Sequence, residues 1–209
     1  MATVGGVVLC GGRSSRMGTP KAWLPIAGET LLARVVRVVG SVVAPVVVVA
    51  APRQAIPPLP AHVTLVRDET EGCGPLAGLV AGLAALEGVC ETVYVSACDV
   101  PFVKPDWIRR VLSLLGEAAA CVPSVNQRLH PLAAAYRVQV LPIARQHLAC
   151  QRFRLHDWVA ALPTRIISPH EWADVDPQMR SLWNINTPED YQAALRELER
   201  EPEELTNFS

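Results

Sequence analysis

The sequence lacks an excess of charge of one sign and lacks a long apolar run, and each absence argues against a class of protein. Of 209 residues, 19% are charged and 5% are aromatic, and the formal net charge is −1. A charge so near zero argues against nucleic-acid binding by phosphate neutralisation and against a polybasic protein of membrane surfaces. The longest apolar run, Val42 to Pro52, is about half of the ~20 residues that span a bilayer, so no transmembrane segment is expected.

Cysteine spacing also excludes a common class of site. No two of the six cysteines form a C-x-x-C pair, and several lie within apolar runs. Buried free thiols are therefore expected, rather than disulfides or a zinc site. The apolar N-terminal stretch has no positive charge before it and soon meets Gly11 and Gly12, so it does not resemble a signal peptide. Together these features predict a cytoplasmic protein. The cysteines are Cys10, Cys73, Cys90, Cys98, Cys121 and Cys150.

Strand-like and helix-like segments alternate through at least the first 125 residues. This alternation predicts an α/β fold with a mostly parallel central sheet and helices on both faces. Residues 1–200 are expected to form one domain, and residues 201–209 a polar C-terminal tail. The strands are expected at 4–10, 46–51, 63–66, 92–97, 119–123 and 132–137, and the helices at 30–39, 75–86, 105–115, 138–149, 154–162 and 187–200.

Several residues fix where these helices begin and how closely they pack. Thr30 is expected to cap the helix that follows it. Gly78 and Gly82, one turn apart, would let their helix approach the sheet closely. Thr187 and Asp190 form the pattern of a capping box. In folds of this kind ligands lie beyond the carboxyl ends of the strands, which directs attention to the loops after residues 10, 66 and 97.

The first of these loops, Leu9 to Lys21, has the composition of an anion-binding loop. Gly11 and Gly12 let backbone N–H groups approach a phosphate closely. Hydroxyl and cationic side chains follow, namely Arg13, Ser14, Ser15, Arg16 and Lys21. A plain strand-to-helix turn would explain the two glycines alone, but not one of only two lysines in the same loop. The loop matches neither G-x-x-x-x-G-K-[ST] nor G-x-G-x-x-G, which weakens ATPase and NAD-dehydrogenase interpretations.

Two aspartates follow predicted strands. Asp99, in V-S-A-C-D-V-P-F, should project beyond its strand, and a hard oxygen ligand there suits Mg²⁺ bound together with substrate phosphates. The alternative, that Asp99 caps the helix beginning near Pro105, is less attractive because that helix is too distant. Asp68, which precedes G-P-L-A-G, is a second candidate for the site and could equally be a solvated loop residue. Glu69 and Glu71 are expected to be exposed.

These motifs resemble those of the molybdenum cofactor guanylyltransferase (MobA) family, whose members are NTP-dependent nucleotidyltransferases. L-C-G-G-R-S-S-R-M-G-x-x-K matches the family's L-A-G-G-x-S-x-R-M-G-x-x-K, with Cys10 where alanine is usual. D-x-P-[FY], G-P-L-A-G, H-P-x-x-A-x-Y and N-x-N-T-P-x-[DE] also match. The resemblance implies a Rossmann-like three-layer sandwich. It implies nucleotide-binding roles for Leu9, Cys10, Gly11, Gly12, Lys21, Asp68 and Asp99.

The resemblance further implies catalytic roles for Arg16, Lys21 and Asp99, with Asp99 as the Mg²⁺ ligand. His130, Asn184 and Asn186 fall in motifs that are expected on the acceptor side of the site, where the pterin and its phosphate would bind. His130 could equally be structural, and Thr187, Pro188 and Asp190 are explained by helix capping alone.

The implied reaction transfers GMP from GTP to molybdopterin, or to its molybdenum form, and releases pyrophosphate. The resemblance also implies transient contact with molybdoenzymes or with other proteins of cofactor biosynthesis. MobA proteins can carry an asparagine near the base, whereas Val46 to Arg53 has no amide side chain, so a molybdopterin cytidylyltransferase stays an alternative. Further alternatives are another NTP-dependent nucleotidyltransferase, such as a sugar-phosphate enzyme, and a non-catalytic nucleotide-binding partner of a molybdoenzyme. An NAD-dependent oxidoreductase would need the missing G-x-G-x-x-G.

Overall fold

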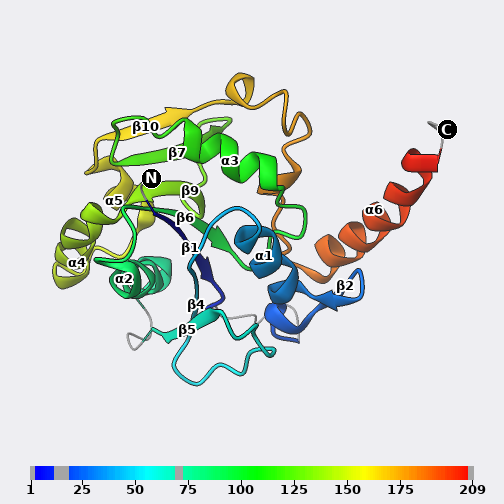
Figure 1. Ribbon diagram of the computed structural model, residues 1–209, viewed down its shortest axis with the longest axis horizontal. Coiled ribbons are helices and arrows are strands. Elements are labelled where there is room, and N and C mark those ends of the chain that lie inside the picture. Colours follow the sequence, from blue (N-terminus) through cyan, green and yellow to red (C-terminus); the bar gives the residue numbers. More distant parts are fainter. Residues whose placement is uncertain (1–2, 12–18, 69–72, 207–209) are drawn as a thin grey trace.

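An eight-stranded sheet forms the centre of the computed structural model, which describes residues 3–11, 19–68 and 73–206 (Figure 1). Its strand order is β10-β7-β9-β6-β1-β4-β5, and β8 pairs with β7. The sheet strands are β1 (Val4–Leu9), β4 (Val46–Ala50), β5 (Val63–Arg67), β6 (Thr92–Ala97), β7 (Ala120–Val125), β8 (Arg128–Leu129), β9 (Ala133–Arg137) and β10 (Thr164–Ile167). A separate two-stranded sheet pairs β2 (Pro25–Ile26) with β3 (Glu29–Thr30).

Helices cover both faces of the large sheet. The α-helices are α1 (Leu31–Gly40), α2 (Gly74–Leu86), α3 (Pro105–Ser113), α4 (Leu141–Ala149), α5 (Leu155–Ala160) and α6 (Pro188–Thr206), and the 3₁₀ helices are η1 (Lys21–Trp23), η2 (Val138–Val140), η3 (Pro169–Glu171) and η4 (Arg180–Leu182). Side chains of α1 and α3 pack on one face of the sheet, and those of α2, α4 and α5 on the other. The predicted three-layer α/β sandwich is confirmed.

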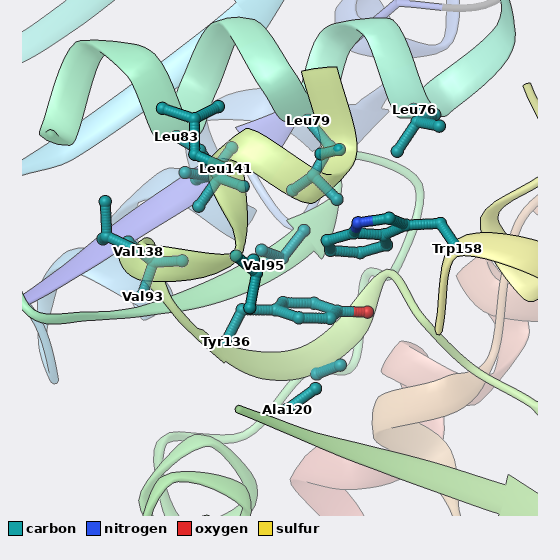
Figure 2. Close-up of a cluster of buried hydrophobic side chains, with 14 of the residues drawn as sticks. Leu76, Leu79, Leu83, Val93, Val95, Ala120, Tyr136, Val138, Leu141 and Trp158 are labelled. Carbon is teal, nitrogen blue, oxygen red and sulfur yellow. The ribbon is translucent and has the colours of Figure 1, made fainter. Parts of the chain in front are cut away.

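The α2 face holds a buried aromatic pair beneath a leucine-rich helix (Figure 2). The rings of Tyr136 in β9 and Trp158 in α5 pack against each other with centroids 5.0 Å apart and planes tilted by 34°. Leu76, Leu79 and Leu83 of α2 lie over the sheet in the same cluster. This packing fixes α2, whose N-terminal end lies beyond β5, against the strands that carry the site.

The predicted cap at Thr30 and the predicted close approach at Gly82 are present, and Gly78 is not needed for that approach. The Thr30 hydroxyl accepts a hydrogen bond from the Ala33 N–H at 3.3 Å, which caps α1. A Cβ on Gly82 would lie 2.5 Å from Cγ1 of Val7, so only glycine lets α2 pack this closely on β1. A Cβ on Gly78 would make ordinary contacts, the nearest 3.5 Å from Cδ2 of Leu9.

The parallel strands at the centre of the sheet are as predicted, whereas the strands beyond β6 differ from the prediction. Strands β1, β4, β5 and β6 are mutually parallel, whereas β9 runs antiparallel to both β6 and β7. Strand β10 was not expected, and it pairs with β7 at one edge. Helix α6 begins near the predicted position but continues to Thr206, beyond the expected end at residue 200, and it projects away from the sheet (Figure 1).

The expectations about the cysteines and about membrane-spanning segments can be compared with the structure. None of the six cysteines is in a disulfide; four of them are buried, Cys73 is half-buried and Cys150 is exposed. The expected burial therefore holds for four of the six. In the part of the chain that the structure describes, no helix is both long enough and apolar enough to cross a membrane.

Candidate active site

Four polar side chains from three distant segments meet beyond the carboxyl ends of β1 and β6. The Lys21 ammonium donates to Oδ2 of Asp99 at 2.7 Å and to Oδ1 of Asn186 at 3.0 Å. The Asn184 amide donates to Oδ1 of Asp99 at 2.9 Å. Both oxygens of the carboxylate are therefore hydrogen-bonded. We call these four residues the Asp99 cluster.

The backbone around Asp99 holds the cluster at the end of the sheet. The Cys98 N–H donates to the carbonyl oxygen of Leu9 at 2.9 Å, which extends the β1–β6 ladder by one bond. The next residue, Asp99, then turns away from the sheet, and its carbonyl oxygen accepts from the Ile185 N–H at 2.9 Å. The aspartate is thus fixed both to the sheet and to the segment that carries the two asparagines.

Lys21 begins η1, the short helix that follows the glycine-rich loop. Its carbonyl oxygen accepts from the Leu24 N–H at 3.1 Å, and the side chain of Ala22 is buried. The Lys21 side chain is 19% exposed and the Asp99 side chain 15% exposed. An ammonium and a carboxylate that are both accessible from solvent can act on a phosphate and on a metal ion at the same place.

The side chains of residues 184–186 alternate in direction, and this alternation brings both asparagines to the cluster. Ile185 is fully buried, in a small core with Leu24 and Phe102, while its two neighbours bond to Asp99 and Lys21. In an extended chain, successive side chains point to opposite sides, so a buried isoleucine directs both asparagines to the cluster. The pattern N-I-N contains this signal.

The predicted capping box ends this segment. The Asp190 carboxylate accepts from the N–H groups of Asn186 and Thr187 at 2.8 and 2.9 Å, and the Thr187 hydroxyl accepts from the Asp190 N–H at 3.2 Å. These backbone donors, Asn186 first, hold the pKa of Asp190 below its ordinary value. The box begins α6 one residue after the cluster and so limits the movement of Asn186.

A buried carboxylate fixes the chain before Asn184, and sequence reasoning missed it. Asp176 is fully buried and accepts from the N–H groups of Arg180 and Ser181 at 3.2 and 2.8 Å. The Lys104 ammonium lies 3.2 Å from its Oδ1, and the Lys104 N–H donates to the Ser181 hydroxyl at 3.2 Å. The start of α3 is thereby attached to the loop that leads to the asparagines.

The Gln54 carboxamide and the Cys10 thiol lie on the other side of β1. The Gln54 carboxamide donates to the carbonyl oxygen of Cys10 at 2.9 Å, and its nitrogen lies 3.5 Å from the Cys10 sulfur. Cys10 and Cys98 both pack into the core on the α1 face. The hydrogen bond with Cys10, together with burial, raises the pKa of the Cys98 thiol well above its ordinary value. Cys98 therefore stays a thiol at neutral pH.

Three other predicted site residues, Leu9, Gly11 and Asp68, lie at or just after the ends of strands, outside the Asp99 cluster. The Asp68 N–H donates to the carbonyl oxygen of Ala50 at 2.9 Å, and the Asp68 carboxylate lies 3.9 Å from where a Cβ on Gly78 would be. Asp68 and Leu9 thus both lie near α2. Gly11 is exposed directly after Cys10, as a phosphate-binding loop requires.

His130 follows β8 and is not part of the Asp99 cluster. Its N–H donates to the carbonyl oxygen of Pro123 at 2.8 Å. Burial, with Arg128 and His156 nearby, lowers the pKa of His130, so the neutral imidazole is favoured. Among the described residues, no hydrogen bond joins its side chain to the cluster. The asparagines therefore lie with Lys21 and Asp99, while the proposed acceptor roles of all three residues stay predictions.

Two sets of predicted residues fall outside the described ranges. Gly12 and Arg16 lie in residues 12–18, as do Arg13, Ser14 and Ser15. Glu69 and Glu71 lie in residues 69–72. Their predicted roles and exposure stay predictions.

The donor set fits a divalent metal held mainly by substrate oxygens. Within residues 3–11, 19–68 and 73–206, no group of three or more histidine, cysteine, aspartate or glutamate side chains could hold a metal ion. Asp99 supplies a hard anionic oxygen, and Mg²⁺ in nucleotide enzymes is commonly bound by one or two carboxylates plus phosphates and water. The site thus suits a metal that arrives with a nucleotide, not a resident metal in an all-protein cage.

Comparison with known proteins decides the family. The family model described as "MobA-like NTP transferase domain" matches residues 6–165, which include most of β1, Lys21 and Asp99. The chain belongs to the MobA-like NTP transferase family. It is thereby a member of a nucleotidyltransferase family, and the resemblance found in the motifs is confirmed.

Individual members of the MobA-like family are similar along most of the chain. A Chloroflexus aggregans protein named "Probable molybdenum cofactor guanylyltransferase" is 37% identical over 191 residues, which cover 88% of this chain and 90% of that protein. A Desulfosudis oleivorans protein named "Molybdenum cofactor guanylyltransferase" is 33% identical over 196 residues, covering 93% and 95% of the two chains.

Solved structures agree on the fold of the MobA-like family. The structure of molybdopterin-guanine dinucleotide biosynthesis protein A from Archaeoglobus fulgidus superposes with a TM-score of 0.78 at 22% identity, covering 94% of this chain and 99% of that one. A nucleotidyl transferase from Methanothermobacter superposes with a TM-score of 0.70 at 21% identity, covering 95% and 98%. At these identities the likeness concerns the fold.

Proposed function

We propose that this protein transfers GMP from GTP to the terminal phosphate of molybdopterin, or of its molybdenum form, and releases pyrophosphate. The observation that carries the proposal is the Asp99 cluster, where an accessible ammonium and an accessible carboxylate lie 2.7 Å apart at the carboxyl ends of parallel strands. Relatives that share 33–37% of their residues with this chain and are named for guanylyl transfer to this cofactor supply the substrates.

The proposed chemistry is a single displacement at phosphorus. An oxygen of the pterin's terminal phosphate attacks the α-phosphorus of GTP and forms a new P–O bond. The bond from the α-phosphorus to the oxygen bridging to the β-phosphate breaks, and its electron pair leaves with pyrophosphate. No covalent enzyme intermediate is needed, because the attacking phosphate is already anionic. The protein's task is to hold the two substrates in line and to offset negative charge.

The cluster residues have distinct parts in this proposal. Lys21 lies where its ammonium would neutralise phosphate charge that builds up as pyrophosphate leaves. Asp99 would hold Mg²⁺ together with the phosphates of GTP, and the bound ion would supply further charge withdrawal from those phosphates. Asn184 orients the Asp99 carboxylate by donating to its Oδ1 at 2.9 Å. Asn186 accepts from Lys21 and so restrains the ammonium.

The proposed location follows from the sequence, and the proposed partners follow from the reaction. A cytoplasmic location stays a prediction from the sequence. GTP and molybdopterin are the substrates of the proposed reaction, and transient contact with molybdoenzymes or with other proteins of cofactor biosynthesis follows from that role.

Pyrophosphate release tests the proposal. Purified protein with Mg²⁺ and molybdopterin is supplied in parallel with GTP, CTP or ATP, and each reaction is repeated without molybdopterin. Release that requires the acceptor and is fastest with GTP is expected. Release mainly with CTP would move the protein to cytidylyl transfer, and nucleotide binding without any release would favour the non-catalytic alternative.

A further inference from the structure

Gln54 makes contacts that are unusual for a loop residue. It lies after β4, in the proline-rich segment that ends at Pro60, and is half-buried. Its Oε1 accepts from the Ala51 N–H at 3.1 Å, and its Nε2 donates to the carbonyl oxygen of Cys10 at 2.9 Å. One carboxamide thus bonds to the backbone at the ends of two neighbouring strands.

The register of β1 and β4 shows what this carboxamide replaces. The strands pair in parallel from Gly6 opposite Val46 to Leu9 opposite Val49, and the Cys10 N–H donates to the Val49 carbonyl at 2.7 Å. In a parallel ladder the next bond would run from the Ala51 N–H to the Cys10 carbonyl. The Gln54 carboxamide instead bonds to both of these groups, the Ala51 N–H and the Cys10 carbonyl. Its carboxamide therefore stands between the strands at the point where they diverge.

Other contacts hold Gln54 in this position. Arg67, the last residue of β5, donates from Nη1 to the carbonyl oxygens of Ala51 and Gln54 at 3.0 and 2.6 Å. The Trp23 indole donates to the carbonyl oxygen of Ala55 at 3.0 Å. Since Trp23 ends η1, which Lys21 begins, the Gln54 segment is attached to the same short helix as the catalytic ammonium.

The position of the Gln54 carboxamide relative to the Asp99 cluster indicates which part of a bound nucleotide it would contact. Asp99 follows β6 on one side of β1, and Gln54 lies between β1 and β4 on the other. Ligands of such sheets lie beyond the strand ends. With the phosphates placed at the β6 side by the proposed function, the nucleoside of the same molecule would extend along the edge toward β4. Gly11 lies there too, since a Cβ on it would be 3.6 Å from the Ala51 nitrogen.

We propose that Gln54 is a positioning residue for the nucleoside: by replacing the last β1–β4 hydrogen bond with its carboxamide, it holds these strands apart and forms the floor on which the nucleoside rests. This inference depends on the proposed function for the orientation of the nucleotide. It predicts that Gln54 governs nucleotide affinity and leaves the chemical step, which belongs to the Asp99 cluster, almost unchanged.

The test replaces the carboxamide by a side chain of similar length without hydrogen bonds. In Gln54→Met the Ala51 N–H can bond directly to the Cys10 carbonyl, so the strands close. Calorimetry should show about tenfold weaker binding of Mg·GTP, the loss expected when one or two hydrogen bonds that shape a site are removed. With molybdopterin present, KM for GTP should rise by a similar factor, while kcat and KM for molybdopterin change less than twofold. Gln146→Met, at an exposed position on α4, is the matched control.

A second variant keeps the test decisive if Gln54→Met folds poorly. Gln54→Glu retains the acceptor for Ala51 and lacks the donor for Cys10, so it should also weaken GTP binding. Unchanged GTP affinity in either folded variant, or a fall in kcat without a change in KM for GTP, would overturn the inference. These results are separable from failure of the proposed function, in which wild-type protein would bind GTP but release no pyrophosphate with molybdopterin.

Discussion

The two sides of β1 end in sites of opposite character. On the β6 side, Lys21, Asp99 and two asparagines bond side chain to side chain, across sequence separations of 78 to 165 residues. On the β4 side, the Gln54 carboxamide bonds mostly to main-chain groups no more than 44 residues away. The charged side chains of the Asp99 cluster suit the reacting phosphates. The uncharged carboxamide of Gln54 suits the nucleoside, which is bound but does not react. The comparison predicts that changes on the β6 side lower kcat and changes on the β4 side raise KM.

The largest effect should follow loss of the carboxylate on the β6 side. Asp99→Asn keeps the size of the side chain but removes the charge that pairs with Lys21 and would hold Mg²⁺. Pyrophosphate release should fall by about three orders of magnitude or more at any Mg²⁺ concentration. Thermal unfolding should show an intact fold. Asp106→Asn, on the exposed surface of α3, is the matched control, and a wild-type rate in Asp99→Asn would remove the metal assignment.

Loss of the ammonium should come next. Lys21→Ala should lower kcat by about two to three orders of magnitude, as is usual when one preorganised group for transition-state charge is removed. Steady-state kinetics with GTP measure this. Arg145→Ala removes a cation from an exposed ion pair with Glu87 and should leave turnover unchanged. A change confined to solubility in Lys21→Ala would mean that the glycine-rich loop has been misread.

A smaller effect distinguishes two roles for Asn184. In Asn184→Ala the Asp99 carboxylate loses a donor at 2.9 Å, and a hydrogen bond to a charged group is worth about 1.5–3 kcal/mol. We expect kcat to fall about 10- to 100-fold and the Mg²⁺ concentration for half-maximal rate to rise. If KM for molybdopterin rises and kcat does not fall, Asn184 serves the acceptor instead.

The smallest effect on turnover should come from α2, which supports both sides of the site without belonging to either. Gly82→Ala places a methyl group 2.5 Å from Cγ1 of Val7 and should lower the free energy of unfolding by about 1–3 kcal/mol. Gly78→Ala, one turn earlier, meets only ordinary contacts, and its free energy of unfolding should match or slightly exceed that of wild type. Equal losses in the two variants, measured by denaturant unfolding, would contradict the packing described for α2.

The sequence predicted what depends on neighbouring residues. Thr30 caps α1 and Asp190 closes the box at α6 because such contacts span three or four positions. The position of Asp99 at a strand end followed from strand and helix alternation, and its expected role followed from the resemblance. The antiparallel direction of β9 did not follow, because a strand's direction depends on partners far along the chain.

Other parts of the site depend on contacts with residues far along the chain. Asn184 and Asn186 lie at the Asp99 cluster because Ile185 is buried. That burial depends on residues far earlier in the chain, such as Leu24 and Phe102. Gln54 stands among prolines with no periodicity, and its carboxamide meets backbone atoms, which every residue has. Residues 46 to 53 contain no amide side chain, but the next residue, Gln54, brings its carboxamide back to the end of β4.

The central claim, that GMP is transferred to molybdopterin, is tested most directly by following labelled phosphorus. Purified protein with Mg²⁺ and molybdopterin is supplied with GTP labelled either at the α- or at the γ-phosphorus, and the pterin product is isolated. The account predicts that α-label enters the product one for one with pyrophosphate release, and that γ-label appears only in pyrophosphate. γ-Label in the pterin product, or α-label retained wholly in free nucleotide, would contradict it.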